Sequence, residues 1–302
     1  MSWFWLSLAA LLCWSGSDLF SKLGCRNGND RLGHLKMVMA VGLVMGLHAC
    51  WEIFFGGTEI SFRIIWTYLP VSLLYILSMT LGYLGLRYIE LSISSPICNA
   101  SGALVAVAAL LTGNGSYPTP VLFAIALVCA GVIGLGVVEA REDEALRAAR
   151  QEAGNFRYAK SWLALALPIA YCLLDAAGTF ADSVVLEVLD EDSANVAYEL
   201  TFLAAGFVCF VYTVLIRKDR LLPREEAPKY LGAVCETAGQ LAYIYAIADG
   251  AHLAMSAPII SAYCMVSVLW SRIFLKEQLS WKHYLMIALV AVGIVVMGVY
   301  DV

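Results

Sequence analysis

The sequence predicts an all-α membrane protein whose ten transmembrane helices form two inverted five-helix repeats. Three observations support this: an apolar composition, ten long apolar runs, and basic residues confined to alternate connections. Of 302 residues, 61% are hydrophobic and only 14% are charged, and the mean hydropathy is +0.77. Soluble domains are roughly half apolar and about a quarter charged, so this composition places the chain in a bilayer. It excludes a soluble enzyme and a disordered scaffold, and the net charge of -5 excludes a nucleic-acid partner.

The apolar runs are each long enough, at about 20 residues, to cross a bilayer as a helix. They cover approximately residues 3–23, 35–55, 64–86, 91–112, 118–138, 161–183, 194–216, 228–248, 252–274 and 282–300. The first run is too long for a signal-peptide core and lacks a basic start, so we expect it to be retained. We therefore expect a first repeat over 1–138, a charged cytoplasmic linker over 139–160 and a second, inverted repeat over 161–302.

The basic residues indicate how the chain is inserted. Consecutive connections lie on alternate sides of the membrane, and one side holds 18 of the 19 Lys and Arg residues. The other side holds only Arg63, together with an acidic run from Glu187 to Asp192. Positively charged loops stay in the cytoplasm. We therefore expect a protein of the plasma (cytoplasmic) membrane with both termini outside the cytoplasm.

The two halves resemble each other at a shift of 162 residues. IALVCAGVIGLGVVE (125–139) lies over IALVAVGIVVMGVYD (287–301), and Pro96 lies over Pro258. At a shift of 157 residues, Asp18 lies over Asp175. Because each half has an odd number of spans, the second half inserts upside down relative to the first. Such inverted repeats are common in secondary transporters, which expose a midplane site to each side in turn.

These features carry a family resemblance. Pro96 and Pro258 open the fourth and ninth spans, and FLKEQLSWKHYLMIALVAVGIVVMG (274–298) leads into a Gly-rich last helix. In this layout the chain resembles the EamA-type branch of the drug/metabolite transporter superfamily, where a Gly-Glu-x-Leu-type turn precedes the last helix. Here Lys276 replaces that Gly, and the matching turn of the first half (112–120) lacks the Glu. The resemblance covers nearly the whole chain and implies a ten-helix transporter, but its motifs name no substrate.

Four acidic residues lie deep in the predicted spans: Asp18, Asp175, Glu199 and Glu236. A charged group in hydrocarbon costs several kcal/mol, so we expect each of these acids to have a structural or functional role. No Lys or Arg lies comparably deep in the sequence of any span. A cavity lined only by acids favours cations or protons, because an anion would meet unopposed negative charge.

Glu236 is the strongest candidate for binding a proton or a cation. It lies in mid-span, and Gln240 and Tyr243 follow on the same helical face. Asp175 and Asp18 are candidates as a pair, the alternative being that each only bonds a neighbouring helix. A structural role is also the alternative for Glu236, and an interfacial role is the interpretation of Glu199, near the outer surface.

Aromatic residues recur at positions expected to face these acids. They are Trp14, Tyr75, Tyr83, Tyr171, Tyr243 and Tyr263. Aromatic faces beside a carboxylate suit an organic cation through cation–π attraction, although a single tyrosine is more often structural. Asn99 follows Pro96, where the proline frees backbone carbonyls for a ligand, with polar contacts between helices as the alternative.

Motifs of enzymes and of metal sites are weak or absent in this sequence. There is no GxxxxGK[ST], and neither Asp18 nor Asp175 has the GxGD of intramembrane aspartyl proteases. Asn99-Ala100-Ser101-Gly102 matches only part of a rhomboid serine motif. The nine scattered cysteines include no CxxC pair, so neither disulfides nor a zinc site are indicated. We expect no enzymatic activity, no metal and no cofactor beyond a proton gradient.

The sequence thus predicts a secondary transporter that moves a small organic solute, cationic or zwitterionic, by proton-coupled alternating access. Its expected partners are this small molecule and the lipid bilayer, and its expected state is a monomer or weak dimer. The alternatives are an intramembrane hydrolase, an uncoupled facilitator and a transporter of lipid-linked substrates. A membrane receptor or assembly partner is disfavoured by the short loops.

Overall fold

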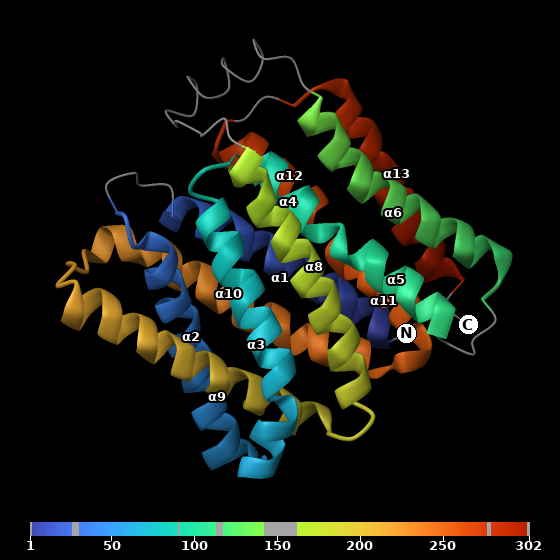
Figure 1. Ribbon diagram of the computed structural model, residues 1–302. Coiled ribbons are helices and arrows are strands. Elements are labelled where there is room, and N and C mark those ends of the chain that lie inside the picture. The colour runs from blue at the N-terminus through green and yellow to red at the C-terminus, as the bar shows by residue number, and fades with distance from the viewer. Residues whose placement is uncertain are drawn as a thin grey trace.

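The computed structural model describes residues 2–25, 30–89, 91–112, 117–141, 162–276 and 279–300, and within them it is helical without strands (Figure 1). The first half contains α1 (Ser2–Cys25), α2 (Gly33–Trp51), the π-helical turn η1 (Glu52–Gly56), α3 (Phe62–Gly85), α4 (Leu91–Asn99), α5 (Ser101–Thr112) and α6 (Thr119–Ala140). The second half contains α8 (Trp162–Val185), α9 (Glu191–Phe210), the π-helical turn η2 (Val211–Ile216), α10 (Pro223–Ala248), the 3-10 turn η3 (Gly250–His252), α11 (Leu253–Ser261), α12 (Tyr263–Phe274) and α13 (Trp281–Val299). Most of the predicted linker, 139–160, lies outside the described residues.

Eight helical segments of the described chain are long and apolar enough to cross a membrane. They are α1, α2 with η1, α3, α4 with α5, α6, α9 with η2, η3 through α12, and α13. The other two long helices, α8 and α10, have 24 and 26 residues and pack against members of this set. The chain is therefore an all-α integral membrane protein, and the count of ten spans stays a prediction.

The helix boundaries repeat along the chain. Helices α4, α5 and α6 begin at Leu91, Ser101 and Thr119, and their counterparts α11, α12 and α13 each begin 162 residues later. Helices α2 and α9 both end in a π-helical turn. The two halves thus contain the same succession of elements.

Helices of one half pack against helices of the other half in matching pairs. Helix α1 packs along α10 and α3 along α8, while α2 pairs with α9 and α6 with α13 at opposite edges of the bundle (Figure 1). The α2–α9 pair is antiparallel, because Gly42 faces Gly206 whereas the later His48 bonds the earlier Glu199. A two-fold axis that exchanges antiparallel helices is perpendicular to them. These contacts are therefore those of an inverted repeat.

Two of the spans are broken in their middle. The fourth span breaks at Ala100, between α4 and α5, and the ninth breaks at Ala262, between α11 and α12. Pro96 and Pro258 each lie four residues before the break, and a proline removes a helical N–H and clashes with the preceding turn. The sequence predicted one continuous span in each case, and the structure shows one spanning segment interrupted at a single residue. Broken helices are typical of transporter binding sites.

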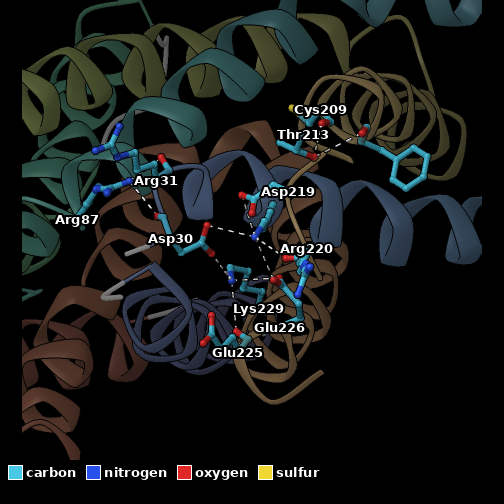
Figure 2. Close-up of polar contacts among 12 residues, drawn as sticks. Asp30, Arg31, Arg87, Cys209, Thr213, Asp219, Arg220, Glu225, Glu226 and Lys229 are labelled. Carbon is cyan, nitrogen blue, oxygen red and sulfur yellow. Dashed lines mark hydrogen bonds and ion pairs between the residues drawn. The ribbon is translucent and has the colours of Figure 1, made fainter. Parts of the chain in front are cut away.

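One end of the bundle holds a largely buried group of ion pairs, which we call the ion-pair cluster: Asp30, Lys36, Asp219, Glu226 and Lys229. Figure 2 labels all of these residues except Lys36. The Lys36 Nζ lies 3.2 Å from Asp30 Oδ1 and 3.2 Å from Asp219 Oδ2. The Lys229 Nζ lies 3.3 Å from Asp30 Oδ2 and 3.0 Å from Glu226 Oε2. The two lysine side chains are only 3% and 1% exposed. Two lysines that the sequence analysis counted among the basic residues of the cytoplasmic side are thus buried near the starts of α2 and α10.

The ion-pair cluster also connects to the end of α3. Arg87 donates hydrogen bonds to the Asp30 and Arg31 carbonyl oxygens at 3.0 and 2.6 Å (Figure 2). Nearby, the buried Lys22 Nζ donates to the Leu86 and Ile89 carbonyl oxygens at 2.6 and 2.8 Å. These contacts join α1, α2, α3 and α10 on the side that the charge distribution predicts to be cytoplasmic.

Candidate substrate-binding cavity

A cavity lies between the two halves and is lined by residues of α1, α3, α4, α5, α8, α9, α10, α11 and α12. It contains about 940 Å3 of empty space, which includes open space at its mouth. All eleven site residues expected from the sequence line this cavity: Trp14, Asp18, Tyr75, Tyr83, Asn99, Tyr171, Asp175, Glu236, Gln240, Tyr243 and Tyr263. Residues from six separate helices are thus brought to one place.

Glu236 projects into the cavity from the middle of α10. Its Oε2 accepts a hydrogen bond from Ser17 Oγ of α1 at 2.6 Å, the one hydrogen bond that it makes within the described chain. Asp18 and Asp175 are close enough to interact with it electrostatically. No Lys or Arg is among the described residues that line the cavity. Within the described chain, Glu236 is therefore a half-buried carboxyl with one neutral donor and no cationic partner.

Asp18 and Asp175 lie on α1 and α8, and serines of the broken spans bind both of them. Asp18 Oδ2 accepts hydrogen bonds from Ser95 Oγ of α4 at 2.5 Å and from Ser267 Oγ of α12 at 2.7 Å. Asp175 Oδ2 accepts from Ser101 Oγ of α5 at 2.7 Å. Both aspartates thus bond neighbouring helices and also line the cavity. Their binding of a proton or substrate stays a prediction.

Aromatic rings surround the acids. The Trp14 ring centroid lies 5.1 Å from that of Tyr243 and 5.8 Å from that of Tyr263. The hydroxyls of Tyr75 and Tyr243 are 2.5 Å apart, and Tyr75 also donates to Thr179 Oγ1 at 3.0 Å. Packing of Trp14 against α10 depends on a glycine, because a Cβ at Gly239 would overlap the Trp14 ring.

Three hydrogen-bond donors that face this cavity have no partner in the described chain. They are Trp14 Nε1, Tyr83 Oη and Gln240 Nε2. The Gln240 residue is only 3% exposed, so bulk water does not solvate it. Because buried donors are normally paired, these three are available to an acceptor on a ligand or to a bound water.

Asn99 lines the cavity at the end of α4, but its own helix occupies its amide nitrogen. The Nδ2 donates to the Ser95 carbonyl at 2.8 Å and reaches Ser95 Oγ at 3.3 Å. The contact with Ser95 Oγ occupies an acceptor site of that hydroxyl, which in turn donates to Asp18. Asn99 therefore acts on the acids through Ser95.

Sequence reasoning missed the environment of two further acids. Asp182 of α8 is fully buried, and its Oδ1 accepts a hydrogen bond from Tyr68 Oη at 2.7 Å. Glu199 is also fully buried, with His48 Nδ1 at 2.9 Å and Asn195 Nδ2 at 3.3 Å, and its interfacial role stays a prediction. The available signal for Asp182 was its place two turns after Asp175 on one face of an apolar run.

The described chain contains no group of three or more His, Cys, Asp or Glu side chains that could hold a metal ion. The acids of the cavity are instead bound by serine hydroxyls. Hydroxyl donors stabilise a carboxylate without neutralising it. The arrangement can therefore exchange protons or bind an organic cation.

Comparison with known proteins finds a match to one family model. The model of the EamA-like transporter family matches residues 163–299, which is almost the whole second half. A search of the curated proteins found no match. Among solved structures, one described only as the crystal structure of a protein aligns with a TM-score of 0.66 at 14% identity, covering 99% of this chain and 96% of that one. This likeness shows a shared fold alone.

The family match indicates what class of protein this is. Members of the family are membrane transporters of small solutes, so the match implies a small-molecule substrate and a lipid environment. The repeated helix order, together with the matching contacts between helices of the two halves, shows the same architecture in the first half. The second half of this chain, over residues 163–299, is therefore similar to the EamA-like transporter family.

Proposed function

We propose that this protein is a secondary transporter that moves a small organic cation or zwitterion across the plasma membrane by proton-coupled alternating access. One observation carries the proposal: Asp18, Asp175 and Glu236 come from three helices into one cavity whose described lining has no Lys or Arg. Unopposed carboxylates attract a cation strongly at low dielectric. The surrounding tyrosine and tryptophan rings add cation–π attraction.

Glu236 is the proposed shared site for the coupling proton and the cation. Among the described residues it has a single hydrogen-bond donor, Ser17, whereas Asp18 is bound by two hydroxyls. Because the described lining of the cavity has no basic residue, an empty cavity would hold a proton on this carboxylate. A cation that binds must displace this proton, and the resulting competition couples the two fluxes.

The unpartnered donors support a substrate that also carries an acceptor. Trp14 Nε1, Tyr83 Oη and Gln240 Nε2 would each accommodate a carboxylate, carbonyl or hydroxyl oxygen. The cationic end of such a molecule would face Glu236. The matching halves would rock about this cavity to open it to either side in turn.

The experiment measures binding of tetraphenylphosphonium, an aromatic organic cation, to the purified protein at pH 6 and pH 8 in weakly buffered solution. Wild-type protein should bind more tightly at pH 8 and release protons on binding. Glu236→Gln keeps the shape of the side chain but cannot ionise, so its binding should lose the pH dependence and the proton release.

The matched control is Glu225→Gln, which removes an exposed carboxylate from the same helix. It should behave as wild type. In liposomes with an imposed pH gradient, wild-type protein should accumulate the probe and Glu236→Gln should not. An unchanged pH profile in Glu236→Gln would make this acid structural and remove the main support for proton-coupled cation transport.

A further inference from the structure

We propose that Ser95 and Ser101 are positioning residues that link occupation of Asp18 and Asp175 to movement of the broken fourth span. This inference rests on the proposed function, because it describes how loading of the same cavity would move helices. The two serines lie on either side of the break at Ala100: Ser95 belongs to α4 and Ser101 begins α5. Each hydroxyl donates to a different aspartate.

The two aspartates belong to different halves of the protein. Ser95 binds Asp18 on α1 of the first half, whereas Ser101 binds Asp175 on α8 of the second half. Relative motion of the halves would therefore move the two anchoring points of α4 and α5 apart or past each other. Ala100, where the regular helix is interrupted, can absorb that displacement. The fourth span is thus held by both halves and has a hinge between its two attachments.

The strength of these attachments depends on what the carboxyls bind. A hydroxyl bound to a carboxylate makes a charge-assisted hydrogen bond, about twice as strong as a neutral one. A proton on Asp18 or Asp175, or a bound cation beside it, removes part of that charge and weakens the bond. Both serines are buried, at 3% and 1% exposure, so water does not replace the lost interaction. Loading of the cavity would consequently loosen α4 and α5.

The internal repeat does not reproduce these two serine hydrogen bonds in the second half. The residues that correspond to Ser95 and Ser101 at the 162-residue shift are Ala257 and Tyr263, neither of which has an aliphatic hydroxyl. The two breaks also touch, because a Cβ on Gly102 of α5 would overlap the Ser261 side chain at the end of α11. A displacement of α5 would therefore reach the second broken span by direct contact.

The first test is the pH dependence of tetraphenylphosphonium binding to Ser101→Ala. Asp175 stays in place, so affinity at high pH should change less than about threefold. Loss of the donor favours the protonated carboxyl, so the binding profile should move to higher pH by about one unit. Ser101→Thr keeps a hydroxyl and should restore the wild-type profile. Ser256→Ala, which removes a buried hydroxyl bonded within α11, should leave the profile unchanged.

The second test needs no substrate. Amide hydrogen exchange over residues 101–112, corrected for the intrinsic effect of pH, should be at least threefold faster at pH 5 than at pH 8 in wild-type protein. In Ser101→Ala the attachment is already lost, so exchange should be fast at both values. Equal exchange at both pH values in wild-type protein would overturn the inference.

The outcomes separate this inference from the proposed function. If wild-type protein shows no pH-dependent cation binding, the proposed function fails. If wild-type protein shows it and Ser101→Ala keeps the same profile, only the positioning role fails. If Ser101→Ala is lost during purification, Ser95→Ala and Ser95→Thr provide the same pair of measurements at Asp18.

Discussion

Removal of one lysine from the ion-pair cluster should destabilise the protein strongly. The Lys229 Nζ lies within 3.3 Å of Asp30 and 3.0 Å of Glu226, and it donates to the Glu225 carbonyl at 3.3 Å. Lys229→Met keeps the aliphatic stem, which packs against Gly24, but removes the charge. Breaking a buried ion pair from one side costs about 3–5 kcal/mol. We expect the lower end of this range, because Lys36 still neutralises part of the remaining charge.

The assay is thermal unfolding in detergent, followed by a thiol-reactive fluorescent dye that reports exposure of the buried cysteines Cys25, Cys98, Cys172 and Cys264. A loss of about 3 kcal/mol should lower the Tm by roughly 6–10 °C. Arg224→Met, at an exposed position on the same helix, is the matched control and should change the Tm by less than about 2 °C. Added salt should not abolish the difference, since buried pairs are screened little.

The double variant Lys229→Met/Glu226→Gln distinguishes the mechanism. It removes one charge of each sign, so it should recover part of the lost stability. The reasoning would be refuted if Lys229→Met unfolded at the wild-type temperature, because the cluster would then contribute nothing to the fold. It would equally fail if the double variant were less stable than the single one by the full cost of a second broken pair.

Three further predictions follow from close contacts and charge. Gly42→Ala should cost about 1–3 kcal/mol, because the new Cβ would lie 2.6 Å from the Phe202 carbonyl oxygen of α9; Gly250→Ala, with open space around it, is the control in a Tm measurement. Gly239→Ala should displace Trp14 and weaken tetraphenylphosphonium binding by tenfold or more in calorimetry, while unchanged affinity would exclude Trp14 from the site. A C-terminal alkaline phosphatase fusion should be active and a fluorescent-protein fusion dark, and the opposite pattern would reverse the predicted orientation.

The residues of the cavity were predictable because each carries a local signal. Glu236 and Asp175 are acids within long apolar runs, and a bilayer makes such residues rare enough to stand out. The helical period then placed Gln240 and Tyr243 on the face of Glu236. All of these side chains line the cavity. Their proposed roles in binding stay predictions.

The partners of the acids were not predictable, since they depend on packing between distant segments. Ser267 is 249 residues from Asp18, and Tyr68 is 114 residues from Asp182. Serine is common in membrane helices and carries no signal of its own. The breaks at Ala100 and Ala262 were likewise hidden, because the apolar composition continues through them and only the preceding prolines mark the place.

The ion-pair cluster was hidden for a different reason. Lys36 and Lys229 lie near the ends of apolar runs, where a basic residue normally indicates a loop in water. A sequence window records their charge but not the acids that reach them from Asp30 and Glu226. Only the fold shows that these lysines are buried and paired.

The charged residues of the ion-pair cluster and those of the cavity have different partners. At one end of the bundle Lys36 and Lys229 are neutralised by acids 3.0–3.6 Å away, and a pair of this kind has nothing to exchange with a solute. In the cavity, Asp18, Asp175 and Glu236 have hydroxyl partners but no cation within the described chain. Hydroxyl donors stabilise a carboxylate without neutralising it, so a proton or a bound cation would stabilise these acids further. In the proposed transport cycle the cavity would therefore exchange one for the other, and that exchange would couple the two fluxes.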